Sequence, residues 1–486
     1  MLNFFKKSVP SPILGLLRPP YHYTLSFLAA VFYWFPSRKL IVIGVTGTNG
    51  KSTVVDLIHA ILTEAGFKTG SISSLRFKIG DDERQNKLKM TMPGRFFLQK
   101  FLRDCVNAGC KYAVLEVTSE GIKQHRHKFI DFGVAAMTNV TPEHIESHGS
   151  FEKYLAAKLK LFELVSKNCS RLSENYQIVI ASDRKKRSGL VFRLWGLFRR
   201  LRPPRNDVPG QSARILIVNS DDPNARKFLA FPAEKKYIYN SSFIAVEKND
   251  KSEKKIIGEK LISAEGISFK IENTTISSKL AGEFNFYNLL AAISISISQN
   301  IDIAIIKKAI AKISGVPGRL EFIQKKPFAV VVDYAHTPDA LRKVYETLHS
   351  NQQPTTNNRR LICVLGAAGG GRDKWKRPEM GKTAAEFCDI IILTNEDPYN
   401  EEPKKILEEI EWGYINLFNL KFSTSSKILD RREAIRTAIK SAKADDIVII
   451  TGKGAEPFIM GPNNTKIPWD DRKVVKEELL KLTVEN

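Results

Sequence analysis

Residues 40–53 constrain the fold of this chain more than any other segment, and they read LIVIGVTGTNGKST. The apolar run at the start predicts a buried strand, and the VVDLIHAILTEAG that follows has the apolar spacing of a helix. A glycine-rich turn between strand and helix is typical of phosphate-binding loops, where backbone N–H groups surround phosphate oxygens. The segment is close to the pattern G-x-x-x-x-G-K-[ST], with Gly50, Lys51 and Ser52 in place. We therefore expect a nucleoside triphosphate site.

One glycine departs from that pattern. The strict spacing requires glycine at position 45, which is Val45, whereas Gly44 lies one residue earlier and Gly47 adds a glycine inside the loop. Lys51 is predicted to contact the outer phosphates, and the Ser52 hydroxyl to bind magnesium. A chance match in a glycine turn is the alternative interpretation, and the flanking strand and helix argue against it.

The composition is that of a soluble globular protein, with 43% apolar and 26% charged residues among 486. A chain of this length predicts roughly two to four domains. Its five cysteines are scattered without a metal-binding spacing, so we expect reduced thiols in a cytosolic protein. The net charge of +23 is compatible with acidic substrates, an anionic membrane surface, nucleic acid or simply a basic proteome. We expect no nucleic-acid partner.

Two segments combine apolar with basic residues. Residues 21–35 read YHYTLSFLAAVFYWF, which is shorter than the ~20 residues of a membrane-spanning helix. A helix at the membrane interface and a helix that packs on the ATP-binding domain are both compatible with this segment. Residues 184–205 interleave arginine and lysine with Leu, Val, Phe and Trp. They fit an amphipathic element at a membrane or partner, or a solvated, partly disordered insertion.

The rest of the chain alternates strand and helix patterns, which predicts an α/β fold with mostly parallel sheets. A strong helix pattern lies at 151–165, and strand patterns lie at 111–119, 132–140, 214–223, 327–335, 360–368, 388–396 and 445–453. We predict three parts: an N-terminal apolar and basic segment at 1–39, a P-loop central domain at 40–317 with a basic insertion at about 184–210, and a smaller Rossmann-like C-terminal domain at 318–486.

Polar side chains follow several of these strands. Glu116 ends one strand, His144 follows another, and Asp333 ends a strand in the second unit. Lys158 lies on the apolar face of a predicted helix, where an unpaired ammonium is unfavourable. Helix caps and surface charges are the alternative for each residue. Because open α/β sheets place their sites at the carboxyl ends of strands, we expect these side chains to share one active site.

The order of the motifs resembles that of the Mur ligases, and most of all the MurE type. The matching segments are GVTGTNGKST, TMPG, LEVTSEGIKQHR, TNVTPEHIESHGSFEKYLAAKLKLF, NSDDP, GEFNFYNLLAA, GVPGRLE, VDYAHTPDAL, GAAGGGRDKWKRPEMG, TNEDPYNEEP, GKGAEP and DDRKVVKEEL, which cover residues 41 to about 480. Mur ligases form amide bonds in peptidoglycan precursors with ATP. The MurE type adds the third amino acid to UDP-N-acetylmuramoyl-L-Ala-D-Glu.

The resemblance implies a role for each matching residue. Lys158 falls on a lysine that is carbamylated in the family, which turns it into a carboxylate-like magnesium ligand beside Ser52, Glu116 and His144. The implied catalytic residues are Lys51, Lys158 and His144. The implied ATP-binding residues are Gly47, Thr48, Asn49, Gly50, Lys51, Ser52, Thr53, Asn285, Asn288, Arg319 and Asp333. The implied substrate-binding residues are Thr91, Met92, Thr118, Gln124, Arg126, Glu396, Asp397, Tyr399, Gly452 and Glu456.

Three features depart from the MurE type, of which the most conservative is a P-loop that ends in Ser52-Thr53 rather than in two threonines. The P-loop begins about 45 residues into the chain, so we expect the N-terminal domain that usually holds uridine diphosphate to be absent. The amino-acid-selecting loop of diaminopimelate-adding enzymes reads D-N-P-R, whereas residues 396–399 read EDPY. The arginine that would bind a carboxylate through two hydrogen bonds is therefore missing. Diaminopimelate, lysine and other amines all stay open as the incoming amino acid.

We therefore expect an ATP- and magnesium-dependent ligase of peptidoglycan synthesis, and hence of cell shape and division, that acts through an acyl phosphate. Its substrates would be the UDP-linked muramoyl dipeptide and an amino acid. The alternative enzyme is a related amide ligase with a lipid-linked or non-peptidoglycan acceptor, like MurT, folylpolyglutamate or cyanophycin synthetases. A degenerate nucleotide-binding adaptor is the non-enzyme alternative, and the intact Lys51, Glu116, His144 and Lys158 argue against it.

The sequence also leads to an expectation about location and assembly. We expect a monomer in the cytoplasm. Peripheral contact with the inner face of the membrane, through residues 1–39 and 184–205, is the open alternative.

Overall fold

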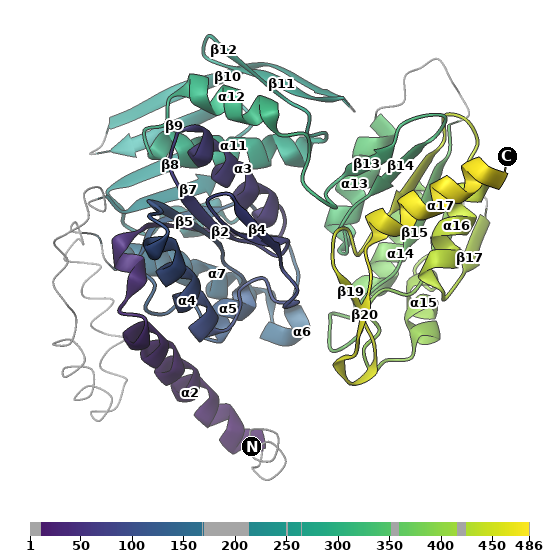
Figure 1. The fold of residues 1–486 in the computed structure, drawn as a ribbon, viewed down its shortest axis with the longest axis horizontal. Helices are drawn as coiled ribbons and strands as arrows, with labels where there is room; N and C mark the ends of the chain where they lie inside the picture. The colour runs from purple at the N-terminus through teal and green to yellow at the C-terminus, as the bar shows by residue number, and fades with distance from the viewer. Residues whose placement is uncertain are drawn as a thin grey trace.

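The computed structural model describes residues 11–167, 169, 213–248, 251–263, 265–350, 359–415 and 424–485. The basic insertion predicted at about 184–210 lies outside these residues. Figure 1 shows two units side by side, each built around one sheet, with helix α2 extending from the larger unit.

The larger unit is built on a 12-stranded sheet in the order β12-β11-β10-β9-β8-β7-β6-β1-β5-β2-β3-β4. The strands from β8 to β2 in this order run parallel to one another, and antiparallel strands extend the sheet at both ends. The strand bounds are β1 Ile41–Thr46, β2 Thr69–Ile72, β3 Arg76–Ile79, β4 Asp82–Gln85, β5 Tyr112–Glu116, β6 Phe132–Met137, β7 Ile215–Asn219, β8 Lys235–Tyr239, β9 Phe243–Lys248, β10 Lys251–Ser263, β11 Gly266–Ile271 and β12 Thr274–Ser278.

Helices cover both faces of this sheet, because successive residues of a strand point to opposite faces. Ile43 on β1 packs in the core formed with α3, α11 and α12, whereas its neighbour Val42 packs in the core formed with α4, α5, α7 and α10. The helix bounds are α3 Lys51–Glu64, α4 Arg95–Asn107, α5 Ser119–Lys123, α6 Ile145–His148, α7 Phe151–Ser166, α10 Ala225–Leu229, α11 Glu283–Ser298 and α12 Ile303–Lys312, and the short 3₁₀ helix η1 is Pro36–Lys39.

The smaller unit has a six-stranded sheet in the order β13-β14-β18-β15-β16-β17, parallel except for β13. Helices α13, α14 and α15 pack on one face, and α16 and α17 on the other. The bounds are β13 Glu321–Gln324, β14 Ala329–Val332, α13 Pro338–Ser350, β15 Leu361–Leu365, α14 Lys376–Phe387, β16 Ile390–Leu393, α15 Pro403–Glu411, β17 Thr424–Lys427, α16 Arg431–Ser441, β18 Ile447–Ile450, β19 Phe458–Met460, η2 Pro462–Asn464, β20 Lys466–Pro468 and α17 Asp471–Glu485.

The predicted α/β class is confirmed. Each predicted strand pattern contains an observed strand, and the helix pattern at 151–165 is α7. The antiparallel strands β9–β12 were not predicted. They are half-exposed strands with many lysines, and their apolar alternation is visible mainly in β11, whose burial alternates along Gly266–Ile271.

Helix α2, Ser11–Phe32, contains the N-terminal apolar segment and begins earlier than the pattern predicted. One side of it packs against α4, with Ser26, Ala29 and Ala30 buried. The other side leaves Leu28 and Phe32 exposed, at 48% and 68% of their surface. Packing on the larger unit therefore accounts for one face of the helix. Among the described residues, no helix has the length and apolar character needed to cross a membrane.

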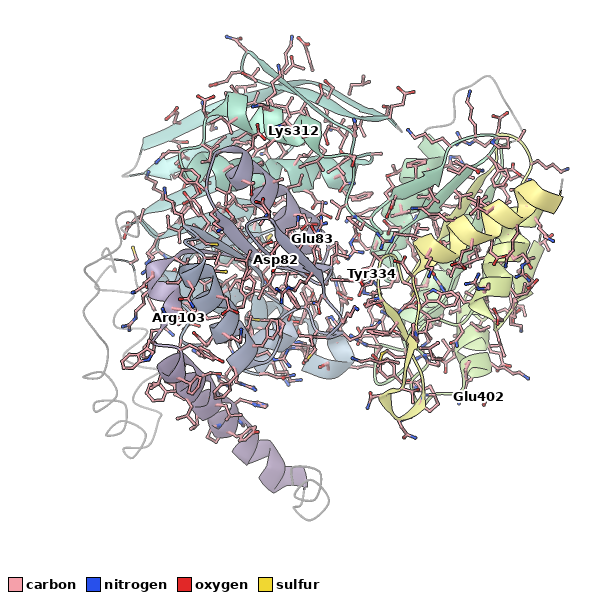
Figure 2. All side chains as sticks on the ribbon, in the orientation of Figure 1. Asp82, Glu83, Arg103, Lys312, Tyr334 and Glu402 are labelled. Atoms are coloured by element: carbon pink, nitrogen blue, oxygen red, sulfur yellow. A yellow bond between two sulfur atoms is a disulfide. The ribbon has the colours of Figure 1, made fainter. Side chains whose placement is uncertain are left out.

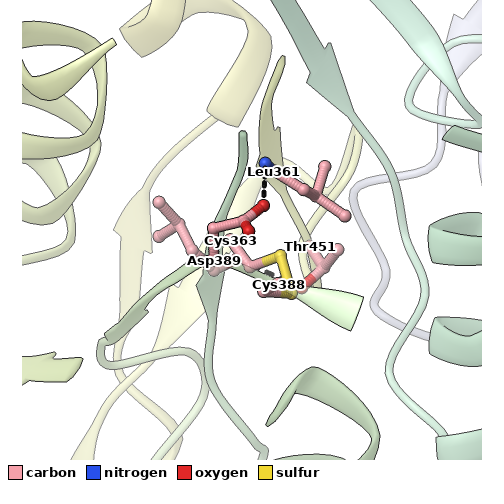
Figure 3. Close-up of a disulfide and its surroundings, with 6 residues drawn as sticks. Leu361, Cys363, Cys388, Asp389 and Thr451 are labelled. Carbon is pink, nitrogen blue, oxygen red and sulfur yellow. Dashed lines mark hydrogen bonds between the residues drawn. A yellow bond between two sulfur atoms is a disulfide. The ribbon is translucent and has the colours of Figure 1, made fainter. Parts of the chain in front are cut away.

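A disulfide joins Cys363 on β15 to Cys388, which lies between the end of α14 and the start of β16 (Figure 3). This corrects the expectation that all five cysteines are reduced thiols. The two residues are 25 positions apart, a spacing that carries no signal in the sequence. They meet because β15 and β16 are neighbouring parallel strands, which brings their Cα atoms to 6.0 Å. Cys105, Cys110 and Cys169 are free and buried.

Candidate active site

The loop between β1 and α3 has the backbone of a phosphate-binding loop. Gly47 and Gly50 have φ angles of 152° and 82°, a region that favours glycine. A Cβ on Gly47 would lie 1.9 Å from the Thr138 hydroxyl oxygen, and one on Gly50 would lie 2.1 Å from Asn288 Oδ1. Helix α3 begins at Lys51, so the unpaired N–H groups of its first turn face the loop.

Neighbouring side chains hold this loop in place. Asn139 Oδ1 accepts a hydrogen bond from the Asn49 N–H at 2.9 Å, and its carbonyl accepts one from the Thr48 N–H at 2.8 Å. The Thr48 hydroxyl pairs with the Tyr154 hydroxyl at 2.9 Å. The Lys51 ammonium donates to the Thr48 carbonyl at 2.7 Å, so it lies over the loop where phosphate oxygens would bind.

Glu116 and Ser52 lie together beside the loop. The Ser52 hydroxyl donates to Glu116 Oε2 at 2.8 Å, and the backbone N–H of Ser74 donates to the same oxygen at 2.9 Å. Lys51 Nζ lies 4.0 Å from Glu116 Oε1. Hydroxyl and carboxylate oxygens are the ligands that magnesium prefers, so this pair fits the predicted metal site. The described residues contain no cluster of three or more His, Cys, Asp and Glu side chains that could hold a metal by themselves.

Lys158 projects from α7 towards the same loop and is 2% exposed. Its ammonium donates to the Gly47 carbonyl at 2.5 Å and lies 4.3 Å from the centre of the Tyr154 ring. Burial, together with the charge of Lys51, lowers the pKa of Lys158 well below its usual value. Burial thus favours the neutral amine over the ammonium, and the neutral amine is the form of a lysine that reacts with carbon dioxide to give a carbamate.

Two histidines from different units meet at the buried carboxylate of Glu143. His144 Nε2 lies 3.8 Å and His336 Nε2 lies 3.3 Å from Glu143 Oε1. Burial would raise the pKa of Glu143, but His144, His336 and Lys376 hold it well below its usual range. Burial lowers the pKa of His144 to about 4, so its ring is neutral at neutral pH and can offer a nitrogen lone pair.

The residues predicted near the nucleotide lie at the junction of the two units, where Figure 2 labels Tyr334. Asn288 lines the cleft, and Asn285 lies behind it and accepts a hydrogen bond from Asn288 Nδ2 at 3.0 Å. The Arg319 guanidinium lies 4.2 Å from the centre of the Tyr334 ring. Asp333 is buried, and its carboxylate accepts from the N–H groups of Leu320 and Ala335, both at 2.6 Å.

The residues predicted to contact the muramoyl peptide divide into two groups. Thr91 and Thr118 line the cleft. Arg126, Gln124 and Met92 do not line it and instead support the loop that carries Thr91. Arg126 donates to the Met92 carbonyl and, at 2.7 Å, to Gln124 Oε1.

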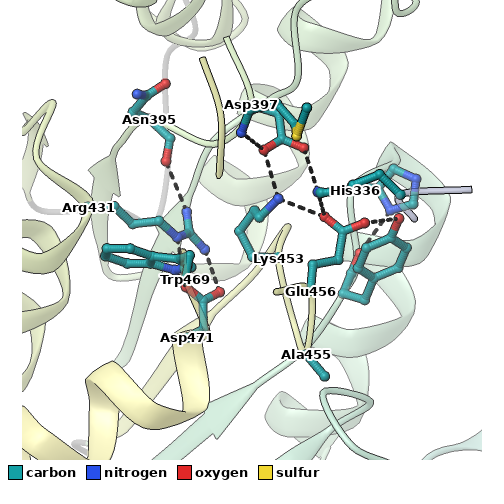
Figure 4. Close-up of polar contacts among 12 residues, drawn as sticks. His336, Asn395, Asp397, Arg431, Lys453, Ala455, Glu456, Trp469 and Asp471 are labelled. Carbon is teal, nitrogen blue, oxygen red and sulfur yellow. Dashed lines mark hydrogen bonds and ion pairs between the residues drawn. The ribbon is translucent and has the colours of Figure 1, made fainter. Parts of the chain in front are cut away.

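The C-terminal unit supplies an acidic wall of the cleft (Figure 4). Lys453 Nζ donates to Asp397 Oδ1 at 2.8 Å and to Glu456 Oε2 at 2.6 Å. Glu396 is buried, and its Oε2 atom has no hydrogen-bond partner among the described residues. Gly452 makes room for this side chain, since a Cβ there would lie 2.6 Å from Glu396 Oε2.

One cleft of about 1230 Å³ joins these groups, with walls from both units. The predicted residues that line it are Thr48, Asn49, Gly50, Lys51, Ser52, Thr53, Thr91, Glu116, Thr118, His144, Asn288, Arg319, Asp333, Glu396, Asp397, Tyr399 and Glu456. The predicted residues outside the lining are Gly47, Met92, Gln124, Arg126, Lys158, Asn285 and Gly452. Gly452 lies directly against a lining residue, Glu396, whereas Lys158 contacts Gly47 of the phosphate-binding loop behind the lining.

Comparisons with known proteins agree on one family. The model of the Mur ligase middle domain matches residues 45–189 and 206–296, and that of the Mur ligase glutamate ligase domain matches residues 318–454. UDP-N-acetylmuramoyl-L-alanyl-D-glutamate–2,6-diaminopimelate ligase of Syntrophomonas wolfei is 35% identical over 469 residues, which cover 96% of this chain and 83% of the relative. The chain belongs to the Mur ligase family.

Further relatives support this assignment. UDP-N-acetylmuramyl-tripeptide synthetase of Roseiflexus is 32% identical over 97% of this chain and 84% of its own length. A solved structure of a UDP-N-acetylmuramoyl-L-alanyl-D-glutamate–2,6-diaminopimelate ligase superposes with a TM-score of 0.54 and 27% identity, covering 91% of this chain and 79% of its own. Mur ligases are ATP-dependent enzymes that form carbon–nitrogen bonds, and this chain is one of them.

Several residues of this Mur ligase line the cleft but were not among the predicted site residues. They include Lys89, Glu143, His336, Arg372 and Lys376. His336 and Arg372 follow predicted strands, which is a usable signal. Lys89 lies in a run of polar and basic residues, RQNKLKM, that has no pattern to distinguish it from Lys87.

Proposed function

We propose that this Mur ligase joins a third amino acid to UDP-N-acetylmuramoyl-L-Ala-D-Glu through an acyl phosphate. The names of its relatives in S. wolfei and Roseiflexus support this substrate. The observation that carries the proposal is one shared cleft, which is lined by residues of the P-loop, of the Thr91 loop and of the acidic loop at 396–399. A phosphoryl donor, an acceptor carboxylate and an amine can therefore meet within it.

The first step is phosphoryl transfer. An oxygen of the dipeptide's glutamate carboxylate attacks the γ-phosphorus of ATP, and the bond to ADP breaks. Lys51 would offset negative charge on the phosphate, and the N–H groups at the start of α3 would hold its oxygens. Ser52, Glu116, His144 and a carbamylated Lys158 would hold magnesium, which when bound offsets charge on the phosphate oxygens.

The second step forms the amide. The nitrogen of the incoming amine attacks the acyl carbon, the carbon–oxygen bond to phosphate breaks, and inorganic phosphate leaves as the nitrogen loses a proton. Positioning accounts for most of the rate in such a reaction. One carboxylate oxygen of Glu396 has no hydrogen-bond partner among the described residues. This oxygen would attract the ammonium group of the incoming amino acid before that ammonium group loses its proton.

The carbamate on Lys158 is part of this proposal. Its support is the burial of the amine, its lowered pKa and its position against the Gly47 carbonyl. Carbamylation would replace a buried cation with an anion that can share a metal with Glu116, which removes the unfavourable burial of an ammonium.

The location of the enzyme also belongs to the proposal. We infer a cytoplasmic monomer whose helix α2 touches the inner face of the membrane. Support comes from the exposed side chains Tyr21, Leu28, Val31 and Phe32 of the helix and Trp34 just after it, since residues 19–37 contain no Asp, Glu, Lys or Arg. These exposed apolar side chains also favour the second candidate function, which is ligation on a lipid-linked acceptor.

The deciding experiment is phosphate release from ATP in the presence of UDP-N-acetylmuramoyl-L-Ala-D-Glu. Diaminopimelate, lysine and ornithine are tested separately, and Lys158→Ala serves as the inactive control. We expect turnover that requires both the dipeptide and one of the amines. Absence of turnover with every amine, while ATP still binds, would overturn the proposed acceptor and favour a lipid-linked one.

A further inference from the structure

Lys89 crosses the cleft from the larger unit to the acidic wall of the smaller one. Its ammonium lies 3.0 Å from Asp397 Oδ2 and forms a second, closer ion pair with Glu456 Oε2. The side chain is only 12% exposed, although it lines the cleft. A contact of this kind holds two units together in one arrangement.

The loop that carries Lys89 is built to project it. Asn86 is buried, and its side-chain Nδ2 donates to the carbonyls of Ser73 at 3.0 Å and Met90 at 3.1 Å. Arg126 donates to the Met92 carbonyl on the far side of the loop. Lys89 itself has a φ of 54°, a left-handed conformation that a lysine rarely adopts. The loop is thus anchored at both ends while its middle residue points outward.

Four charged side chains meet where Lys89 reaches the smaller unit, and their charges balance. Asp397 and Glu456 each contact Lys453 of their own unit and Lys89 of the other, which gives two carboxylates and two ammonium groups. The lysines hold the pKa of Glu456 at about 2 against the effect of burial, so the carboxylate stays charged. Removal of Lys89 would leave the carboxylates of Asp397 and Glu456 with one cation between them.

The two loops joined in this way carry the two reacting partners of the proposed reaction. Thr91 lies two residues after Lys89 and lines the acceptor side of the cleft. Glu396 and Tyr399 flank Asp397 and line the amine side. The ion pairs therefore set the distance between the acceptor loop and the amine loop.

We propose that Lys89 is a positioning residue, which fastens the acceptor loop of one unit to the amine loop of the other in the closed enzyme. This inference rests on the proposed function for the identity of the reactants. It predicts that loss of the ion pairs weakens the use of dipeptide and amino acid, whereas ATP, which binds at the P-loop, keeps its affinity. The reaction of the dipeptide with the amino acid slows because their effective concentration falls steeply when the two loops misplace them.

The test compares Lys89→Met and Lys89→Arg with Lys87→Met, a neighbouring exposed lysine on the same loop. We expect Lys89→Met to lower kcat/KM for the amino acid about 30-fold, because it leaves Asp397 and Glu456 short of a cation. Its dissociation constant for ATP should stay as in the wild type. Lys89→Arg keeps the positive charge and should retain most of the wild-type kcat/KM. Lys87→Met should behave as the wild type.

A second readout does not depend on turnover. Small-angle X-ray scattering with a non-hydrolysable ATP analogue measures the radius of gyration of the full chain, and we expect Lys89→Met to be more extended than Lys87→Met. If the wild type fails with every substrate, the proposed function fails, and the scattering comparison still decides the role of Lys89.

Three outcomes would overturn the inference. In the first, Lys89→Met keeps both its kcat/KM and its radius of gyration. In the second, it loses thermal stability and ATP affinity together, which would show a general structural role. In the third, Lys89→Met binds lysine or ornithine more tightly than the wild type, which would show that Lys89 blocks a cation site.

Discussion

Lys158 shows how burial at a single residue creates chemical reactivity. Burial of an ammonium is unfavourable and lowers the pKa of Lys158, which favours the neutral amine that a carbamate requires. Lys160 lies two residues further along α7 and is exposed, so it offers a matched control on the same helix.

We predict that Lys158→Ala lowers kcat by roughly 100-fold or more, because it removes the proposed carbamate, an anionic ligand at the phosphoryl-transfer site. Lys160→Ala should keep normal activity. Carbon-13 NMR in labelled bicarbonate should show a carbamate signal in the wild type that is absent from Lys158→Ala. A signal that persists in this variant would contradict the assignment.

His59 is a second residue whose environment sets its chemistry. It is buried in α3, and burial together with Lys78 and Arg76 lowers its pKa to about 4. The unfolded chain, with an ordinary histidine pKa of about 6.5, binds this proton more readily. Stability is therefore full above pH 6.5 and falls as the pH drops towards 4.

We predict that His59 contributes up to about 3 kcal/mol to this acid destabilisation. Urea unfolding at pH 7 and pH 5 measures it, and His59→Gln should show a smaller difference between the two pH values. An unchanged difference would assign the effect to other histidines, since burial also lowers the pKa of His125 and His127.

At the scale of elements, α3 has a glycine before its first residue and another after its last turn, with different consequences. A Cβ on Gly50 meets Asn288 Oδ1 at 2.1 Å, whereas one on Gly66 meets nothing within 4 Å. Both residues have a positive φ. We predict that Gly50→Ala weakens ATP binding at least about tenfold by displacing the loop.

Gly66→Ala is the matched control. It should cost about 1 kcal/mol of stability through its left-handed backbone and leave ATP binding unchanged. Isothermal titration with ATP and thermal unfolding separate the two effects. Equal loss of ATP affinity in both variants would contradict a specific role of the phosphate loop.

Helix α2 has apolar residues on two sides. One side packs on the larger unit, and the other side is exposed. Phe32 contacts Phe96 of α4, with ring centres 6.3 Å apart, and the basic residues Arg38 and Lys39 lie in η1, the short helix that comes after α2. Aromatic side chains beside cationic ones are typical of a surface that binds anionic lipid.

We predict that the full chain sediments with phosphatidylglycerol vesicles and that Phe32→Ser together with Trp34→Ser weakens this binding about tenfold. Leu480→Ser on α17 is the control, because Leu480 is as exposed as Phe32, at 68%. Wild-type chain that stays in the supernatant, or that forms dimers instead, would contradict lipid as the occupant.

At the scale of the whole molecule, the two units touch at points that only the tertiary structure creates. Asp373 of the smaller unit accepts hydrogen bonds from the N–H groups of Ile145 at 3.1 Å and Glu146 at 2.9 Å. The Lys374 N–H donates to Glu146 Oε1 at 2.6 Å. These bonds close the cleft beside His144.

We predict that Asp373→Ala lowers kcat/KM about tenfold and leaves the chain folded, because a charge-assisted bond between the units is lost. Asp81→Ala, an exposed aspartate of the larger unit, should have no effect. Activity of Asp373→Ala equal to that of Asp81→Ala would show that this contact is dispensable for closure.

The sequence by itself determined the α/β class, the P-loop and a set of site residues most of which line the cleft, because periodicity and motif spacing are local properties. Only the tertiary structure decided which distant groups meet: Lys89 with Asp397 and Glu456, Glu143 with His336, and Cys363 with Cys388. Each of these pairs joins residues from different strands or units. Their proximity depends on the order of the strands in each sheet and on the packing of the two units against each other. Local sequence patterns contain no information about either.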